Sequence, residues 1–126
     1  MAAAPNFAAT VRASAANIAT ADTSRTSPTN VGTVFTAGSG GSRIDEVNIV
    51  STGTTTGGVI RLWVHTGSTY YLLSEVLVTA ITPSVTQAVF SSTLVYNNLM
   101  LPSGHSLRAT TNNSESFNVI AFGGDF

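Results

Sequence analysis

The sequence predicts an all-β protein: an antiparallel β-sandwich of about eight strands, with the jelly roll as the expected version of that architecture. Two observations predict it. Apolar and polar residues alternate with a period of two along most of the chain, as they do in strands that bury one face. Clusters of Gly, Asn, Ser and Pro interrupt the alternation at short intervals, as turns between antiparallel strands do. With 126 residues, the chain is expected to form one domain.

Eight segments carry the strand pattern. The predicted strands are residues 11–18, 31–36, 43–51, 59–66, 69–79, 87–96, 106–111 and 117–122. In the third, Ile44 and Val47 fall out of step, which predicts a β-bulge near Asp45 and Glu46 if both are buried. Residues 20–30 are rich in Ser and Thr and predict a linker or a long surface loop. An immunoglobulin-like sandwich is the alternative arrangement, although the Cys and Trp pattern of that family is missing.

The start of the chain predicts an extended N-terminal arm, residues 1–10, ahead of a single β-sandwich domain, residues 11–126. This Ala-rich segment is too short and too irregular to fold by itself, so we expect it to become ordered on a partner. Phe7 would anchor it there. The residues expected to contact that partner are Pro5, Phe7, Val11 and Arg12.

The composition points to a protein that lives in an assembly. Only 9% of the residues are charged, against roughly 25% in average soluble domains, and all five basic residues are Arg. Interfaces deplete Lys and keep Arg, although a high-GC genome produces the same bias. A net charge of −1 gives no source of phosphate neutralisation, so no nucleic-acid partner is expected. Neither a membrane span nor a secretion signal is visible, so no membrane partner is expected either.

The hairpin at residues 59–79 carries apolar side chains on both of its faces. One face fills the core, while the other presents Trp63, Tyr71, Leu73 and Leu77. An exposed patch of this size is rare on a monomer. We therefore expect these residues to form a subunit interface; cover by a loop or by the N-terminal arm is the alternative.

The residue types that carry catalysis are present but not grouped. His65 and His105 lie at turns, without further metal ligands at workable spacing. No Gly-x-Ser-x-Gly elbow frames a serine nucleophile. Asp45 and Glu46 are adjacent on a strand, so they point to opposite faces and cannot flank one bond. We therefore expect no enzymatic activity, no metal, no cofactor and no small-molecule substrate.

Several phrases between residues 41 and 126 carry a family likeness. They are Gly-Ser-Arg-Ile-Asp-Glu (41–46), Thr-Gly-Thr-Thr-Thr-Gly-Gly (52–58), Val-Thr-Ala-Ile-Thr-Pro-Ser (78–84), Leu-Pro-Ser-Gly-His-Ser-Leu-Arg-Ala (101–109) and Phe-Asn-Val-Ile-Ala-Phe-Gly-Gly-Asp-Phe (117–126). In these phrases the chain resembles small virion structural proteins of tailed bacteriophages. The resemblance implies a jelly-roll-type sandwich placed on the capsid surface as a cement or decoration protein. It also implies a homotrimer, and it offers no catalytic residues.

Three functions are compatible with the sequence. The leading expectation is a cement protein of the virion that contacts the major capsid protein and copies of itself. The alternative is a tail-fibre or baseplate module that binds a host receptor, with Trp63 or Tyr71 stacking on sugars. A carbohydrate-active enzyme ranks last because a pair of facing carboxylates is missing.

Overall fold

The computed structural model describes residues 10–126, and all regular structure in that range is β-strand. The strands are β1 (Thr10–Ile18), β2 (Gly32–Thr36), β3 (Ser42–Ser51), β4 (Gly58–His65), β5 (Tyr70–Val78), β6 (Ser91–Leu101), β7 (Ser106–Thr111) and β8 (Phe117–Asp125). No helix in this range is long and apolar enough to cross a membrane. The predicted all-β sandwich is confirmed.

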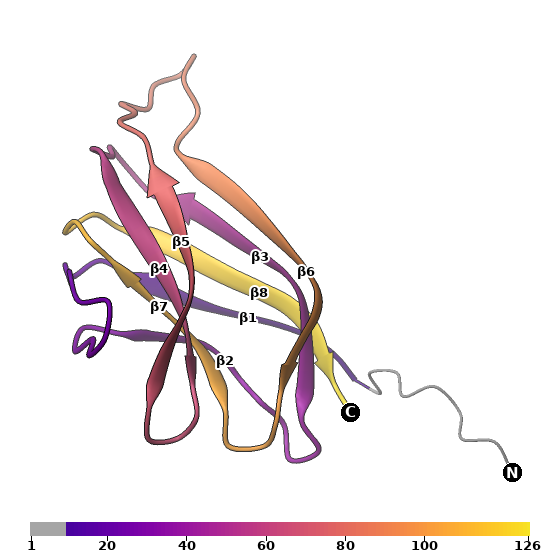
Figure 1. Cartoon of the computed structure of the whole chain (residues 1–126). Coiled ribbons are helices and arrows are strands. Elements are labelled where there is room, and N and C mark those ends of the chain that lie inside the picture. The colour runs from indigo at the N-terminus through magenta and orange to yellow at the C-terminus, as the bar shows by residue number, and fades with distance from the viewer. Residues whose placement is uncertain (1–9) are drawn as a thin grey trace, which may run out of the picture.

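The strands form two four-stranded sheets that face each other (Figure 1). The strand order is β1-β8-β3-β6 in one sheet, here called sheet A, and β2-β7-β4-β5 in the other, sheet B. Every pairing between these strands is antiparallel. Along the chain, consecutive strands alternate between the sheets, except that β4 and β5 form a hairpin within sheet B. Most contacts therefore join residues far apart in sequence.

The core lies between the sheets and is made by the inward positions of the strands. Sheet A contributes residues such as Ile44, Val47 and Ile49, while Ile60 and Leu62 come from sheet B; all five are fully buried. At one end of the core, the rings of Phe90 and Phe117 meet edge to face, 6.2 Å apart. Such pairs add about 0.5–1.5 kcal/mol beyond the burial of their area.

Six predicted strands match the structure to within one residue at each end, and two differ. β8 continues three residues further than predicted. β6 begins four residues later and ends five residues later, because Asn97 and Asn98, which favour turns, lie inside it. Pairing with β3 holds the strand together beyond them, since Leu99, Met100 and Leu101 align with residues 42–44. Tertiary pairing overrides the local preference here.

The predicted β-bulge in β3 is confirmed. Against β8, Ile44 aligns with Gly123 and Glu46 with Phe122, so Asp45 is the extra residue of β3. Against β6, Ile44 aligns with Leu99 and Glu46 with Val95, so there the extra residues lie on β6. Ile44 and Val47 are therefore both buried. Gly123 of β8 lies beside the bulge, and a Cβ atom there would overlap the carbonyl oxygen of Arg43.

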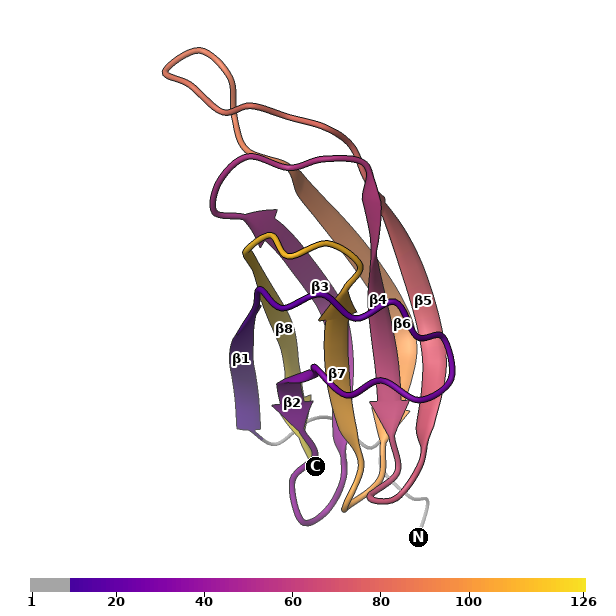
Figure 2. The same ribbon diagram turned by 90° about the vertical axis from the view of Figure 1, so that its left-hand side faces the viewer.

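Two long connections leave the sandwich in different ways. Residues 19–31, between β1 and β2, cross in front of β7 and β4 on the outer side of sheet B (Figure 2). Residues 79–90, between β5 and β6, instead project beyond the end of the sandwich (Figures 1 and 2). Backbone hydrogen bonds between Ser84 and Gln87 close the tip of this projection, where Val85 is fully exposed.

Candidate functional site

The outer side of sheet B is covered in part, which corrects the expectation for Trp63. The indole ring is fully buried, and its Nε1 donates a hydrogen bond of 3.0 Å to Oγ1 of Thr110 on the neighbouring β7. Tyr70 packs against it edge to face, with ring centroids 6.0 Å apart. Trp63 is therefore buried against its neighbours on β5 and β7, on the side of the sheet that residues 19–31 cross (Figure 2). It cannot contact a partner or stack on a sugar.

Arg61, next to Trp63 on the same outer side, is also almost completely buried. Its Nε donates to Glu75 at 2.9 Å, and one Nη donates to the backbone oxygen of Asp22 in the crossing segment at 3.2 Å. Both Nη atoms also reach the side-chain oxygen of Asn112. The buried cation therefore ties residues 19–31 to sheet B, and Arg25 adds a more exposed ion pair to Glu75.

Asp22 gives the crossing segment its shape. Its carboxylate accepts hydrogen bonds from the backbone N–H groups of Ser24, Thr29 and Asn30, at 3.0, 2.6 and 2.9 Å. Burial alone would raise the pKa of Asp22, but these donors outweigh it and hold the pKa below its ordinary value. A backbone hydrogen bond from Asp22 to Thr111 then joins the segment to β7.

The remaining hairpin residues of the predicted patch are divided by a second, unpredicted bulge. The β4–β5 register shifts so that Leu62 aligns with Ser74 and Trp63 with Leu72, leaving Leu73 unpaired. A one-residue slip exchanges the faces of a strand. Leu73 consequently packs against the core.

Tyr71 and Leu77 therefore end on different sides of β5. Tyr71 aligns with the inward-facing Val64, and Leu77 lies on the outer side of sheet B. They remain 60% and 72% exposed. The patch predicted from Trp63, Tyr71, Leu73 and Leu77 does not form as one surface.

The residues near the N-terminus that were predicted to contact a partner differ in their environments. Pro5 and Phe7 lie outside the described residues. Val11 is exposed at the start of β1. Arg12, by contrast, is half-buried and occupied within the fold: it donates to the backbone oxygen of Thr36 and to Asp125, and its guanidinium lies 4.1 Å from the centre of the Phe35 ring. Arg12 thus bridges the two sheets.

The outer side of sheet A contrasts with that of sheet B, and we call it the open face. Two rows across the four strands define it; they are two residues apart on β1 and β8 but five residues apart on β6, where the exposed Asn97 and Asn98 lie between them. The first row is Val11, Gly124, Arg43 and Met100, and the second is Ala13, Phe122, Glu46 and Val95. A shallow, largely apolar groove follows the β1 side of these rows, lined by residues such as Ala13, Phe122 and Gly123.

The open face combines exposed apolar groups with a few charges. Val11, Val95, Met100 and Phe122 are all exposed. Arg43 donates through Nε to Asp45 at 2.9 Å. Sequence reasoning missed this surface, although Val95 and Phe122 stand at outward positions of their strands just as Leu77 does. Apolar residues at those positions were the available signal.

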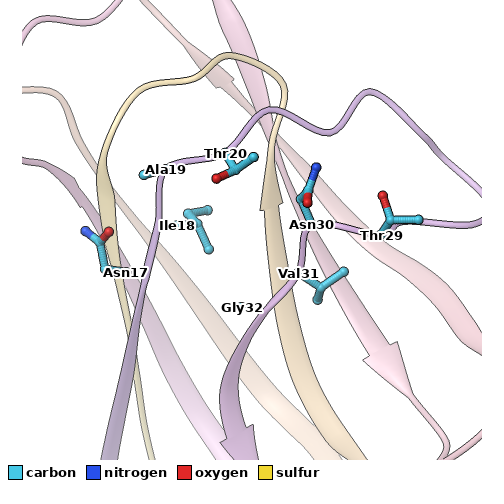
Figure 3. Close-up of a pocket in the computed structure, with 8 residues that line it drawn as sticks. All are labelled: Asn17, Ile18, Ala19, Thr20, Thr29, Asn30, Val31 and Gly32. Atoms are coloured by element: carbon cyan, nitrogen blue, oxygen red, sulfur yellow. The ribbon is translucent and has the colours of Figure 1, made fainter.

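A second depression lies where residues 19–31 leave β1 and rejoin β2 (Figure 3). Its volume is about 310 Å³, and its lining is uncharged: Asn17, Ile18, Ala19, Thr20, Thr29, Asn30, Val31 and Gly32. The amide of Asn30 already donates to the backbone oxygen of Ala21. The lining of this depression contains no titratable side chain.

The two histidines lie together at the opposite end of the sandwich. Gly67 donates its backbone N–H to Nδ1 of His65, whose ring lies 4.4 Å from that of Tyr70. Desolvation, followed by the positive charge of Arg108 and the influence of His105, lowers the pKa of His65. Within residues 10–126, no group of three His, Cys, Asp or Glu side chains could hold a metal ion.

Comparison with known proteins finds no matching family model, no matching curated protein and no matching solved structure.

Proposed function

We propose that this protein is a structural component of a bacteriophage virion that decorates and stabilises the capsid as a cement protein. The observation that carries the proposal is the open face of sheet A. A sandwich that covers part of one outer side with its own chain and leaves Val11, Val95, Met100 and Phe122 exposed on the other is suited to contact further protein surface. The virion, its capsid surface and the major capsid protein as partner belong to this proposal.

The fold supports the same proposal. Eight strands in two sheets, ordered β1-β8-β3-β6 and β2-β7-β4-β5, suit a jelly roll, which we infer as the finer description of this sandwich. The resemblance of residues 41–126 to phage virion proteins implies that architecture as well. A cement protein acts through buried contact area rather than chemistry, so the proposal includes no enzymatic activity.

Copy number tests the proposal. A cement protein occupies the whole capsid lattice, so we expect hundreds of copies per particle, in a fixed ratio to the major capsid protein. Quantified gel bands or mass spectrometry of purified virions measure this ratio. A few to tens of copies would contradict the cement function.

That second result would favour the receptor-binding alternative, a tail-fibre or baseplate module. The exposure of Tyr71 supports this alternative, because a ring that is 60% exposed could stack on a sugar. Trp63 no longer supports it. A glycan array with the protein and its Tyr71→Ala variant tests this binding directly: sugar binding that disappears in the variant would support the alternative.

The N-terminal arm remains part of the proposal. We expect deletion of residues 1–9 to leave the melting temperature nearly unchanged and to weaken attachment to capsids that lack the protein. Phe7→Ala should reproduce part of the loss, because burying an aromatic ring contributes about 1.5–3 kcal/mol. Undiminished attachment of the deletion variant would contradict the role of the arm. Homotrimer formation stays a prediction, which light scattering tests, but it no longer has the hairpin patch as its basis.

A further inference from the structure

The two rows of the open face differ in a way that makes the face complementary to itself. The first row holds a cation, Arg43, and the second an anion, Glu46. These two residues are neighbours along β3, on either side of the bulge at Asp45. A two-fold axis that crosses the strands between the rows would place the first row of one copy on the second row of the other.

That arrangement also matches large side chains with small ones. Phe122 of one copy would lie over Gly124 of the other, and Val11 over Ala13, while Met100 would meet Val95. Each contact occurs twice, as in any two-fold interface. Two sheets packed face to face lie about 10 Å apart with interdigitated side chains. Gly124 is buried between its cross-strand neighbours Val11 and Arg43, so the Phe122 ring of the other copy would pack on these two side chains.

Both charged residues of the two rows, Arg43 and Glu46, can form a further ion pair. Within residues 10–126, Glu46 forms no ion pair, and Arg43 uses only its Nε in the pair with Asp45. The Nη atoms of Arg43 can therefore donate to Glu46 of a second copy. An apolar partner would instead bury Glu46 without a cation, which is costly. This argues for a second copy of the same chain as the occupant.

The area fits a weak contact. The axis lies about two residues from the start of β1 and from the end of β8, so the overlap covers about five residues of each strand. Four strands spaced about 4.8 Å apart, with about five residues of roughly 3.3 Å each, give roughly 300 Å² per copy and roughly 600 Å² in total, the size of a weak, transient contact. We expect a dissociation constant on the order of 100 μM.

We propose that a second copy of this chain docks on the open face of sheet A, with Arg43 of each copy facing Glu46 of the other. The resulting unit is a two-fold dimer. The proposal does not rest on the capsid function, because the contact uses only this chain and forms in solution. Failure of the copy-number test would leave it untouched. A capsid contact and this dimer would compete for the open face.

Sedimentation of the full chain over a range of concentrations tests the dimer with a matched pair of variants. Val95→Lys changes a residue of the open face that is 71% exposed, and Leu77→Lys changes one on sheet B that is 72% exposed. We expect Val95→Lys to weaken dimerisation at least about tenfold and Leu77→Lys to leave it within about twofold. Circular dichroism and melting curves confirm that both variants fold.

Three results would overturn the proposal. They are a monomer at all concentrations up to several hundred micromolar, a trimer mass in place of the dimer, which is the assembly that the resemblance to phage proteins implies, and loss of association in Leu77→Lys but not in Val95→Lys.

A charge exchange tests the arrangement within the dimer. Arg43→Glu gives a face with only acidic charges, and Glu46→Arg gives one with two arginines beside Asp45. We expect each variant alone to dimerise more weakly than the wild type, and an equimolar mixture to form heterodimers. A mixture that associates no better than the separate variants would contradict the pairing of Arg43 with Glu46.

Discussion

The outer sides of the two sheets have similar sequence patterns and opposite environments. On sheet B, Arg61 and Trp63 point outward and are buried, and the segment 19–31 crosses this side of the sheet (Figure 2). On sheet A, Val95 and Phe122 also point outward and are exposed. The comparison teaches that outward apolar residues do not by themselves mark an interface. The length and course of a connection elsewhere in the chain decide whether they join the core.

Among the substitutions that test this difference, Trp63→Ala should have the largest effect on the free energy of unfolding. We expect Trp63→Ala to lower the free energy of unfolding by about 3–5 kcal/mol, because it leaves a cavity against β5 and β7. It also removes the hydrogen bond to Thr110. Denaturant titration measures the change, and Val95→Ala on the open face is the control, with an expected loss below about 0.5 kcal/mol. Equal losses in the two variants would show that the two outer sides do not differ.

Removing the Asp22 carboxylate should have the next largest effect. Asp22→Ala leaves three backbone N–H groups of the crossing segment without their acceptor. We expect a loss of about 1–3 kcal/mol and faster proteolysis within residues 19–31. Limited proteolysis with mass spectrometry locates the cuts. Cleavage confined to residues 79–90 would mean that Asp22 does not hold the crossing segment.

Acid should loosen the same segment, with a smaller effect. The pKa of Asp22 is lower in the fold than its ordinary value of 3.8. The stabilisation is therefore fully present above about pH 4 and is lost as the pH falls through the lower, folded pKa. Melting curves from neutral pH to pH 2 should show a steeper decline in the wild type than in Asp22→Asn. Parallel declines would assign the acid sensitivity to other carboxylates.

The smallest effect is expected for Arg25, the exposed partner of Glu75. Arg25→Ala should cost less than about 1 kcal/mol, because solvent screens an exposed ion pair. The buried Arg61 offers the contrast on the same carboxylate: Arg61→Ala should cost about 3 kcal/mol or more through lost packing and broken hydrogen bonds. Chemical denaturation of both variants checks the order. A reversed order would mean that the crossing segment depends on its exposed ion pair.

The sequence by itself determined the sandwich, the positions of six strands and the bulge at Asp45. These features depend on local information, because alternation identifies a strand and a break in alternation identifies an extra residue. Ile44 and Val47 could both be inward only if one residue between them was unpaired. In the structure, Asp45 is unpaired against β8 in this way.

Only the tertiary structure decided which outward residues are covered. A period of two separates the faces of a strand, but it does not say what lies above either face. Arg61 donates to the backbone oxygen of Asp22, some forty positions earlier, and so ties residues 19–31 across sheet B, while Trp63 is buried against Tyr70 of β5 and Thr110 of β7. Likewise, the bulge at Leu73 depends on pairing with β4, and it reverses the faces on one half of β5. Such contacts join residues distant in sequence, so no local pattern in the chain encodes them.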